Sequence, residues 1–294
     1  MSKKLLPALL CVAVFVACKD SGAPLKKGRI IACSIFPVCD IVKNVAGNRA
    51  DVFFIIPAGA NPHTFEMLPS IIKKIQQADM YIGVNPGFDG WAALYLNEKA
   101  SAMYLQRDND NAHARDHHAA HDHEVNPHIW LSAGGAATIA RAAAAYLAGI
   151  DPDGARVYSE NAAAYEKELA ALDGAMKRLF GGVKNRRFIQ WHPAWDYLAA
   201  ECGLEIAGTI QKGHGDTPSV REFKELVEKA RSRGVKVVVV EFNIRNREAD
   251  ALAAEIGAGV VGLDTIGNPA IDEKSSYIKM MMHNAELLSQ ALKR

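Results

Sequence analysis

Two runs of alternating strand-like and helix-like segments limit the folds open to this chain more than any other feature of its sequence. Short β-branched and apolar runs recur with helical patterns between them, and this order indicates parallel sheets with crossover helices. The near-continuous apolar run VKVVVV is typical of a strand that is covered on both faces. The predicted strands are 29–36, 51–57, 79–84 and 101–106 in the first run, and 187–191, 204–210, 235–242 and 259–264 in the second.

A long helical region separates the two runs. Residues 132–150 predict a helix with Ser132 as its N-cap, and residues 151–182 predict a second helix between Asp-Pro and Gly-Gly. We therefore expect an α/β protein in which two parallel-sheet lobes are joined by a long rigid backbone helix. The expected parts are an N-terminal lobe at 29–150, the connecting helix at 151–182 and a C-terminal lobe at 183–294.

The first residues have the composition of a targeting segment. MSKK is basic, and the apolar run after it is too short to cross a bilayer as an anchor. The run ends in FVAC, which resembles the lipobox of bacterial lipoproteins, with Phe15 where leucine is expected. We predict a signal peptide at 1–18 with lipidation of Cys18, then a polar tether at 19–28. An ordinary cleaved signal peptide is the alternative.

Four metal-capable side chains lie at the ends of predicted strands or in the loop regions that follow them. These are His63, His128, His192 and Asp264. Ligands of open α/β sheets bind outside the carboxyl ends of the strands, so we expect these groups to face one cleft between the lobes. Each residue alone is more often a turn or core residue. Together, three imidazoles and one carboxylate suit a tetrahedral Zn²⁺ site.

Two of these histidines stand in the same motif, Asn-Pro-His, and the third precedes a proline. Proline restricts the backbone, so such loops are stiff and hold an imidazole in place before a metal arrives. Glu66 and Glu241 are candidates for orienting a ligand imidazole through its other nitrogen. Glu241 also competes with Asp264, and with water, for the fourth coordination position.

A second group of histidines lies in a polar loop, predicted at 107–125, that has no apolar periodicity. It holds half of the ten histidines of the chain: His113, His117, His118, His121 and His123. Such a tract cannot pack, and its neutral imidazoles bind Zn²⁺, Cu²⁺ or Ni²⁺ less tightly than a preorganised site does. We expect a low-affinity metal loop, with a merely solvated loop as the alternative.

Charge and cysteine content add little to this picture. The formal net charge of +1 gives no electrostatic case for binding nucleic acid. Outside the predicted signal peptide and lipobox, the cysteines are Cys33, Cys39 and Cys202. A disulfide between Cys33 and Cys39 and a set of buried thiols are both open.

Six motifs spread from residue 29 to the C-terminus carry a resemblance to a known family. They are PHTFE, PSIIKKIQQADMYIGVN, NPHIWLS, HPAWDYLA, GLDTIG and YIKMMMHNAELLSQAL. Together they resemble the cluster A-I metal-binding lipoproteins of bacterial ABC importers, which include ZnuA-like zinc and TroA-like manganese receptors. The resemblance implies a monomeric receptor in the cell envelope, held by a lipid anchor and serving an ABC permease. It also implies ligation by His63, His128 and His192, with Asp264 as the carboxylate that some members add.

The ligand types favour zinc. Imidazole-rich sites suit Zn²⁺, whereas Mn²⁺ prefers oxygen, and a His-rich loop is typical of the zinc receptors in this family. The predicted function is a high-affinity zinc-binding receptor that captures Zn²⁺ between the lobes and delivers it to a permease, without enzymatic activity. The alternatives are a Mn²⁺ or Fe²⁺ receptor of the same family, a zinc-dependent hydrolase and an adhesin-like surface protein.

Overall fold

The computed structural model describes residues 28–106, 126–211, 217–242 and 246–294, and within them it forms two four-stranded parallel sheets. The sheet orders, β2-β1-β3-β4 and β6-β5-β7-β8, are equivalent, so the lobes share one topology. All eight predicted strands are confirmed, and each ends earlier than predicted. The strands are β1 (Arg29–Cys33), β2 (Ala50–Phe54), β3 (Met80–Gly83), β4 (Ser101–Tyr104), β5 (Arg187–Gln190), β6 (Glu205–Thr209), β7 (Val237–Glu241) and β8 (Gly259–Leu263).

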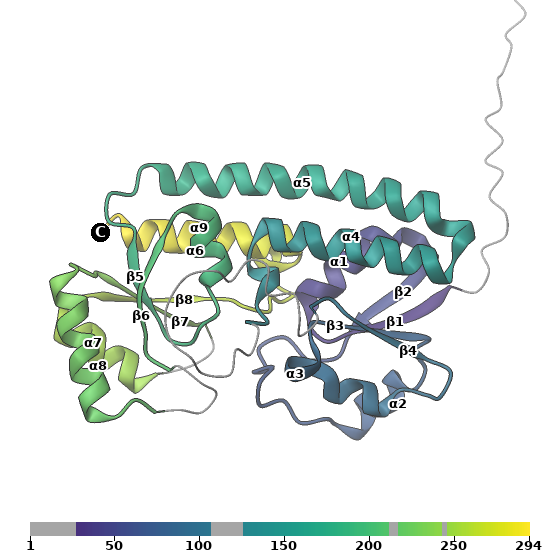
Figure 1. Ribbon diagram of the computed structural model, residues 1–294, viewed down its shortest axis with the longest axis horizontal. Coiled ribbons are helices and arrows are strands. Elements are labelled where there is room, and N and C mark those ends of the chain that lie inside the picture. The colour runs from purple at the N-terminus through teal and green to yellow at the C-terminus, as the bar shows by residue number, and fades with distance from the viewer. Residues whose placement is uncertain (1–27, 107–125, 212–216, 243–245) are drawn as a thin grey trace, which may run out of the picture.

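Helices connect the strands and cover the sheets (Figure 1). The first lobe contains α1 (Phe36–Ala46), α2 (Pro69–Ile75), α3 (Pro86–Asp89) and α4 (Ala133–Ile150), and the second α6 (Asp196–Cys202), α7 (Val220–Ser232), α8 (Arg247–Ile256) and α9 (Tyr277–Leu292). Short 3₁₀ helices are η1 (Gly47–Arg49), η2 (Gly90–Tyr95), η4 (Ile129–Leu131), η5 (Pro152–Gly154) and η6 (Asp272–Lys274). The predicted N-cap of α4 is confirmed, because the Ser132 hydroxyl accepts a bond from the Gly135 N–H.

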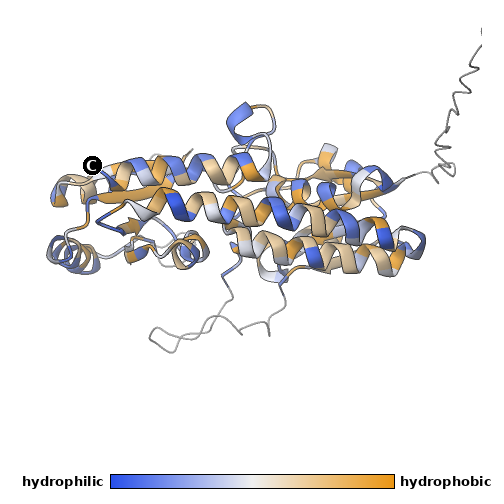
Figure 2. Cartoon of the chain, turned by 90° about the horizontal axis from the view of Figure 1, so that it is seen from above, coloured by the Kyte–Doolittle hydropathy of each residue, from blue (hydrophilic) through white to orange (hydrophobic). Residues whose placement is uncertain are grey.

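The long helix α5 (Ala155–Gly181) runs along both lobes. Its 27 residues extend about 40 Å, and it packs on α1 and α4 over the first lobe and on α9 over the second. The helix begins later than the predicted 151–182 segment, because Pro152 opens a 3₁₀ turn first. Seen from above, α5 carries both hydrophilic and hydrophobic residues (Figure 2). Its buried residues recur every three or four positions, from Tyr158 to Phe180, as expected for a helix with one buried face.

One hydrophobic core continues from the first lobe, beneath α4 and α5, into the second lobe. It includes Ile31 and Ile82 from the first sheet, Leu169 from α5, and Trp195 and Val239 from the second lobe. A smaller cluster fills the other face of the second sheet, under α7 and α8. Because the main cluster includes both lobes, apolar packing opposes their separation.

Hydrogen bonds of two buried aromatic residues also join the lobes. The Trp130 Nε1–H, which belongs to η4, donates to the carbonyl oxygen of Thr265 after β8 (2.7 Å). The Tyr277 hydroxyl at the start of α9 lies 2.8 Å from the carbonyl oxygens of Trp130 and Ser132. These bonds fix the start of α4 against the carboxyl end of β8.

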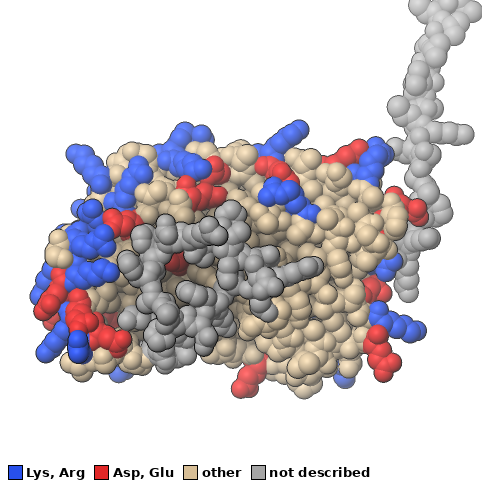
Figure 3. All heavy atoms as spheres, viewed as in Figure 1, with Lys and Arg blue, Asp and Glu red and all other residues tan. Residues whose placement is uncertain are grey.

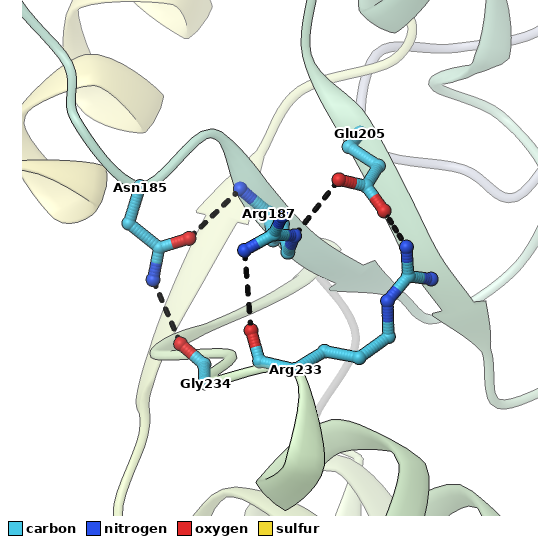
Figure 4. A network of polar contacts seen from close by, with 5 residues as sticks. All are labelled: Asn185, Arg187, Glu205, Arg233 and Gly234. Atoms are coloured by element: carbon cyan, nitrogen blue, oxygen red, sulfur yellow. Dashed lines mark hydrogen bonds and ion pairs between the residues drawn. The ribbon is translucent and has the colours of Figure 1, made fainter.

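The opposite end of the second sheet is held by charged groups at its surface. Glu205 at the start of β6 accepts a bond from Arg187 Nε (2.8 Å) and another from Arg233 (Figure 4). Lys and Arg side chains are interspersed with Asp and Glu over α7 and α8 on the face shown in Figure 3. None of the helices in the described ranges is long and apolar enough to cross a bilayer.

Candidate metal centre

Three histidines far apart in the sequence meet between the lobes. His63 lies in the loop after β2, His128 immediately before η4, and His192 in the loop after β5. One ring nitrogen from each lies within 4.8 Å of those of the other two. The Nε2 atoms of His128 and His192 are 3.3 Å apart. Tetrahedral zinc, with Zn–N bonds of about 2.0–2.1 Å, holds its nitrogen ligands about 3.4 Å apart, so these atoms fit around one ion after a small closure.

The two Asn-Pro-His motifs form the same local turn. The Asn61 side-chain oxygen accepts the His63 backbone N–H (2.9 Å), and the Asn126 oxygen accepts the His128 N–H (3.0 Å). Such asparagine turns fix the backbone without a regular element. The repeated motif therefore places each imidazole two residues after an asparagine that holds its main chain.

Asn126 also orients the ring of His128. Its oxygen lies 2.8 Å from His128 Nδ1, and its amide nitrogen donates to the Pro193 carbonyl (2.9 Å) and to Asp196 (3.2 Å). Because the amide oxygen can only accept, Nδ1 carries the proton, and the Nε2 lone pair remains for a metal. Asn126 thus links the His128 turn to the segment that follows His192.

Glu241 has the same effect on His192. Its Oε1 lies 2.9 Å from His192 Nδ1, so the carboxylate accepts that proton and leaves Nε2 as the ligand atom. From the sequence, Glu241 is a candidate for orienting a ligand imidazole, and the structure places it beside His192. With both Nδ1 atoms donating, the two Nε2 lone pairs face each other at 3.3 Å and repel unless a cation or an added proton lies between them. Two nitrogen lone pairs that face each other in this way favour the binding of a cation between them.

The surroundings of the site exclude water from two of the three rings. His128 and His192 are 3% and 6% exposed, and His63 is half-buried. The Phe88 ring lies 5.1 Å from the His63 ring, and the Trp130 ring lies 5.2 Å from that of His128. Aromatic walls of this kind lower the local dielectric and hold the imidazoles in place.

Asp264 does not join the histidines as expected. In the described part of the chain, the group of mutually close ligand atoms consists of the three histidines. Asp264 Oδ1 accepts the N–H groups of Ile266 (3.1 Å) and Gly267 (2.8 Å), and Oδ2 lies 2.9 Å from Lys274 Nζ. The carboxylate predicted as a fourth ligand is therefore held by a lysine and two backbone amides.

Glu66 also differs from the expectation. Its side chain is exposed, and no hydrogen bond joins it to His63 within the residues that the structure describes. The residues that sequence reasoning missed are Asn61 and Asn126. The signal that could have found them is the repeated asparagine itself, since Asn two positions before a ligand can close this turn.

The remaining predicted sites fall in two groups. Cys18 and the five histidines of the 107–125 loop lie outside the described residues. Cys33, Cys39 and Cys202 are free and buried, so the structure has no disulfide between Cys33 and Cys39. Burial raises the pKa of the Cys33 thiol well above its usual value, and the nearby Cys39 adds to the shift. The alternative of buried thiols describes these residues.

A family model and two relatives show that the chain is similar to proteins of zinc binding and zinc uptake. The family described as periplasmic zinc-uptake complex component A, ZnuA, matches residues 31–291. The zinc-binding lipoprotein AdcA of Streptococcus pneumoniae serotype 4 is 29% identical over 304 positions, which cover 97% of this chain and 60% of AdcA. The chain thus spans about three fifths of that relative. The high-affinity zinc uptake system protein ZnuA of Bacillus subtilis is 27% identical, covering 96% of this chain and 95% of that protein.

Solved structures agree with the fold. A crystal structure of ZnuA has a TM-score of 0.75 at 27% identity and covers 90% of this chain and 99% of its own. A mutant of the laminin-binding adhesin Lmb from Streptococcus agalactiae has a TM-score of 0.77 at 26% identity, covering 90% of this chain and all of its own (100%). Both structures therefore match the arrangement of both lobes.

Proposed function

The chain belongs to the family of periplasmic zinc-uptake components, and from this premise we propose that it is the zinc-binding receptor of an ABC importer. In this proposal, His63, His128 and His192 capture Zn²⁺ between the lobes, and the protein delivers the ion to a membrane permease. The observation that carries the proposal is the convergence of three ring nitrogens within 4.8 Å from loops far apart in the sequence.

The ligand set supports zinc as the cargo. Three neutral imidazoles give a nitrogen-rich site, which suits Zn²⁺ better than the oxygen-seeking Mn²⁺. Glu241 accepts the Nδ1 proton of His192 and places a negative charge beside the ion. We infer that solvent completes the fourth position. Both relatives described above carry zinc in their names, which adds support for zinc over manganese or iron.

The N-terminal segment and the His-rich loop have supporting roles in the proposal. Acylated Cys18 would hold the protein at the membrane, and the tether at 19–28 would give it reach toward the permease. The histidines of the 107–125 loop would collect zinc weakly near the tight site. The S. pneumoniae relative is named a lipoprotein, which favours such an anchor here.

A zinc hydrolase is less well supported than a receptor. A catalytic zinc site needs an open coordination position and a general base aimed at the bound water. Among the described residues, Glu241 is a carboxylate that contacts a ligand histidine, and its Oε1 is already hydrogen-bonded to His192. The matched family is described as a component of zinc uptake, which favours a receptor.

Elemental analysis and calorimetric zinc titration of protein stripped of metal test the proposal. We expect one tight zinc per chain in the parent and in a variant that lacks 113–123, which would lose only the additional weak sites. His192→Ala should abolish tight binding. His283→Ala, a substitution at a half-buried histidine of α9, is the matched control and should keep the tight zinc. Tight binding that survives His192→Ala would exclude the proposed site.

A further inference from the structure

A buried ion pair lies at the position where a fourth metal ligand was expected. Asp264 and Lys274 are 7% and 4% exposed, and Lys274 Nζ lies 2.9 Å from Asp264 Oδ2. The other carboxylate oxygen, Oδ1, already accepts two backbone N–H bonds in the turn that follows β8. Lys274 therefore holds the one oxygen of this carboxylate that the turn leaves for a ligand.

The loop between β8 and α9 fixes the lysine in this position. The Lys274 N–H donates to the Ile271 carbonyl (2.9 Å), and the Lys274 carbonyl accepts the Asn268 N–H (3.3 Å). The ammonium group also lies 3.7 Å from the centre of the Phe242 ring, a cation–π contact. A lysine is seldom buried without a partner, and this one has an anion, an aromatic face and a fixed backbone.

Two series of contacts connect the ion pair to the histidines. Asp264 follows β8, whose last residue, Leu263, pairs with Glu241 of β7, and Glu241 holds His192. The next residue, Thr265, accepts the bond from Trp130, whose ring contacts that of His128. The carboxylate thus follows the strand beside β7, whose Glu241 orients His192, and precedes Thr265, which holds Trp130 beside His128.

We propose that Lys274 is a specificity-determining residue that withholds the Asp264 carboxylate from the bound ion. With Oδ2 held by the ammonium, the ion meets three nitrogens and solvent, which Zn²⁺ accepts and Mn²⁺ disfavours. Without the lysine, Oδ2 becomes an oxygen ligand for a harder cation. This inference rests on the proposed function, because it takes the three histidines as the zinc ligands.

Metal affinities of four variants test the inference, measured by competition with a chelating indicator at fixed pH. Lys274→Met should tighten Mn²⁺ binding about tenfold or more and change Zn²⁺ binding about threefold or less. Lys274→Arg keeps the cation and should match the parent. The double variant Lys274→Met/Asp264→Asn should lose the Mn²⁺ gain. A gain of equal size for both metals would indicate only a change in local charge and would overturn the proposal.

Each single substitution leaves one buried charge without its partner, the carboxylate in Lys274→Met and the ammonium in Asp264→Asn, whereas the double variant removes both charges. Asp264→Asn in the parent removes no ligand if Lys274 withholds the carboxylate, so both affinities should stay within about twofold. The visible spectrum of bound Co²⁺ should likewise be unchanged in Asp264→Asn and altered in Lys274→Met, a change that a merely structural role would not produce.

The outcomes separate this inference from the proposed function. A marked loss of zinc affinity in Asp264→Asn would identify Asp264 as a ligand and overturn the role of Lys274, while the receptor function would stand. An unchanged ratio of Mn²⁺ to Zn²⁺ affinity in folded Lys274→Met would have the same meaning. Failure of the parent to bind zinc tightly would instead refute the receptor function itself.

Discussion

At the scale of single residues, the site depends on groups that hold the imidazoles as much as on the imidazoles. Asn126 accepts from both the backbone and the ring of His128, and it donates across the lobe boundary to Pro193. Asn61 makes only the first kind of contact with His63 among the described bonds. The two asparagines of one motif therefore differ in what they contribute.

This difference gives a paired prediction. Asn126→Ala frees the His128 ring to rotate and change tautomer, and we expect zinc affinity to fall about 10- to 100-fold, as for other groups that orient metal ligands. Asn61→Ala removes a backbone turn contact alone and should cost less. Calorimetric titration of both variants measures the contrast, and equal losses would contradict the orienting role of the Asn126 side chain.

Asp89 gives a prediction about pH. It is fully buried (0% exposed), and its Oδ2 accepts the Val84 N–H (2.6 Å). Burial raises the pKa of Asp89 to about 6, above the usual 3.8. Well below pH 3.8, Asp89 is protonated in both the folded and the unfolded chain. As the pH rises to 6, the unfolded chain releases the proton first, so the folded state loses stability, and the full loss persists above pH 6.

Asp89→Asn should therefore stabilise the protein at pH 8 by up to about 3 kcal/mol and leave it nearly unchanged at pH 4. Thermal unfolding of the metal-free parent and variant between pH 4 and pH 8 measures this difference. Asp51→Asn, at an exposed position of β2, is the control. An equal gain in stability at pH 4 and pH 8 would indicate that Asp89→Asn acts through packing rather than through loss of the carboxylate charge.

At the scale of elements, a helix terminus joins the lobes near the site. Glu201 of α6 accepts the N–H groups of Ala133 (2.8 Å) and Gly134 (2.7 Å), the first residues of α4. A carboxylate at a helix N-terminus satisfies free donors and complements the helix dipole. Since His128 precedes α4 and His192 precedes α6, this contact sets the spacing of the elements that follow two ligands.

Removal of this contact should weaken the fold. We expect Glu201→Ala to reduce the free energy of unfolding by about 1–2 kcal/mol, because the first N–H groups of α4 lose their acceptor. Glu205→Ala removes a surface carboxylate from the arginine pair of Figure 4 and should cost less than about 1 kcal/mol. Urea unfolding of both variants tests this order, and a reversed order would contradict the role given to Glu201.

At the scale of the whole molecule, bound zinc should stabilise both lobes together. An ion that binds only the folded chain adds about 4 kcal/mol when free zinc is a thousandfold above Kd. For a protein of this size, that is a rise in Tm of roughly 10 °C. Differential scanning calorimetry should show one transition that moves as a unit, and none of this shift in His192→Ala. Two transitions, with only one moved by zinc, would contradict a shared core.

Most of the architecture could be predicted from the sequence, because each strand and helix has a pattern within its own residues. Each strand has a short apolar run, and the rule that ligands gather at strand ends selected His63, His128 and His192. Asp264 met the same rule, yet its partner Lys274 is buried by a loop fold that no periodicity encodes. The orienting role of Asn126 depends on Pro193, a contact between lobes that only the folded chain reveals.

The continuous core has a consequence for how cargo leaves. Apolar packing extends from α1 through α5 to α9, so tilting one lobe away from the other would expose that interior to water. In the proposed receptor, we therefore expect zinc to be released through the movement of individual segments rather than of whole lobes. His63 is the most accessible of the three imidazoles, and residues 55–68 around it form no regular element. We expect the ion to dissociate when a membrane partner displaces residues 55–68, while the sheets and the long helix α5 keep their positions.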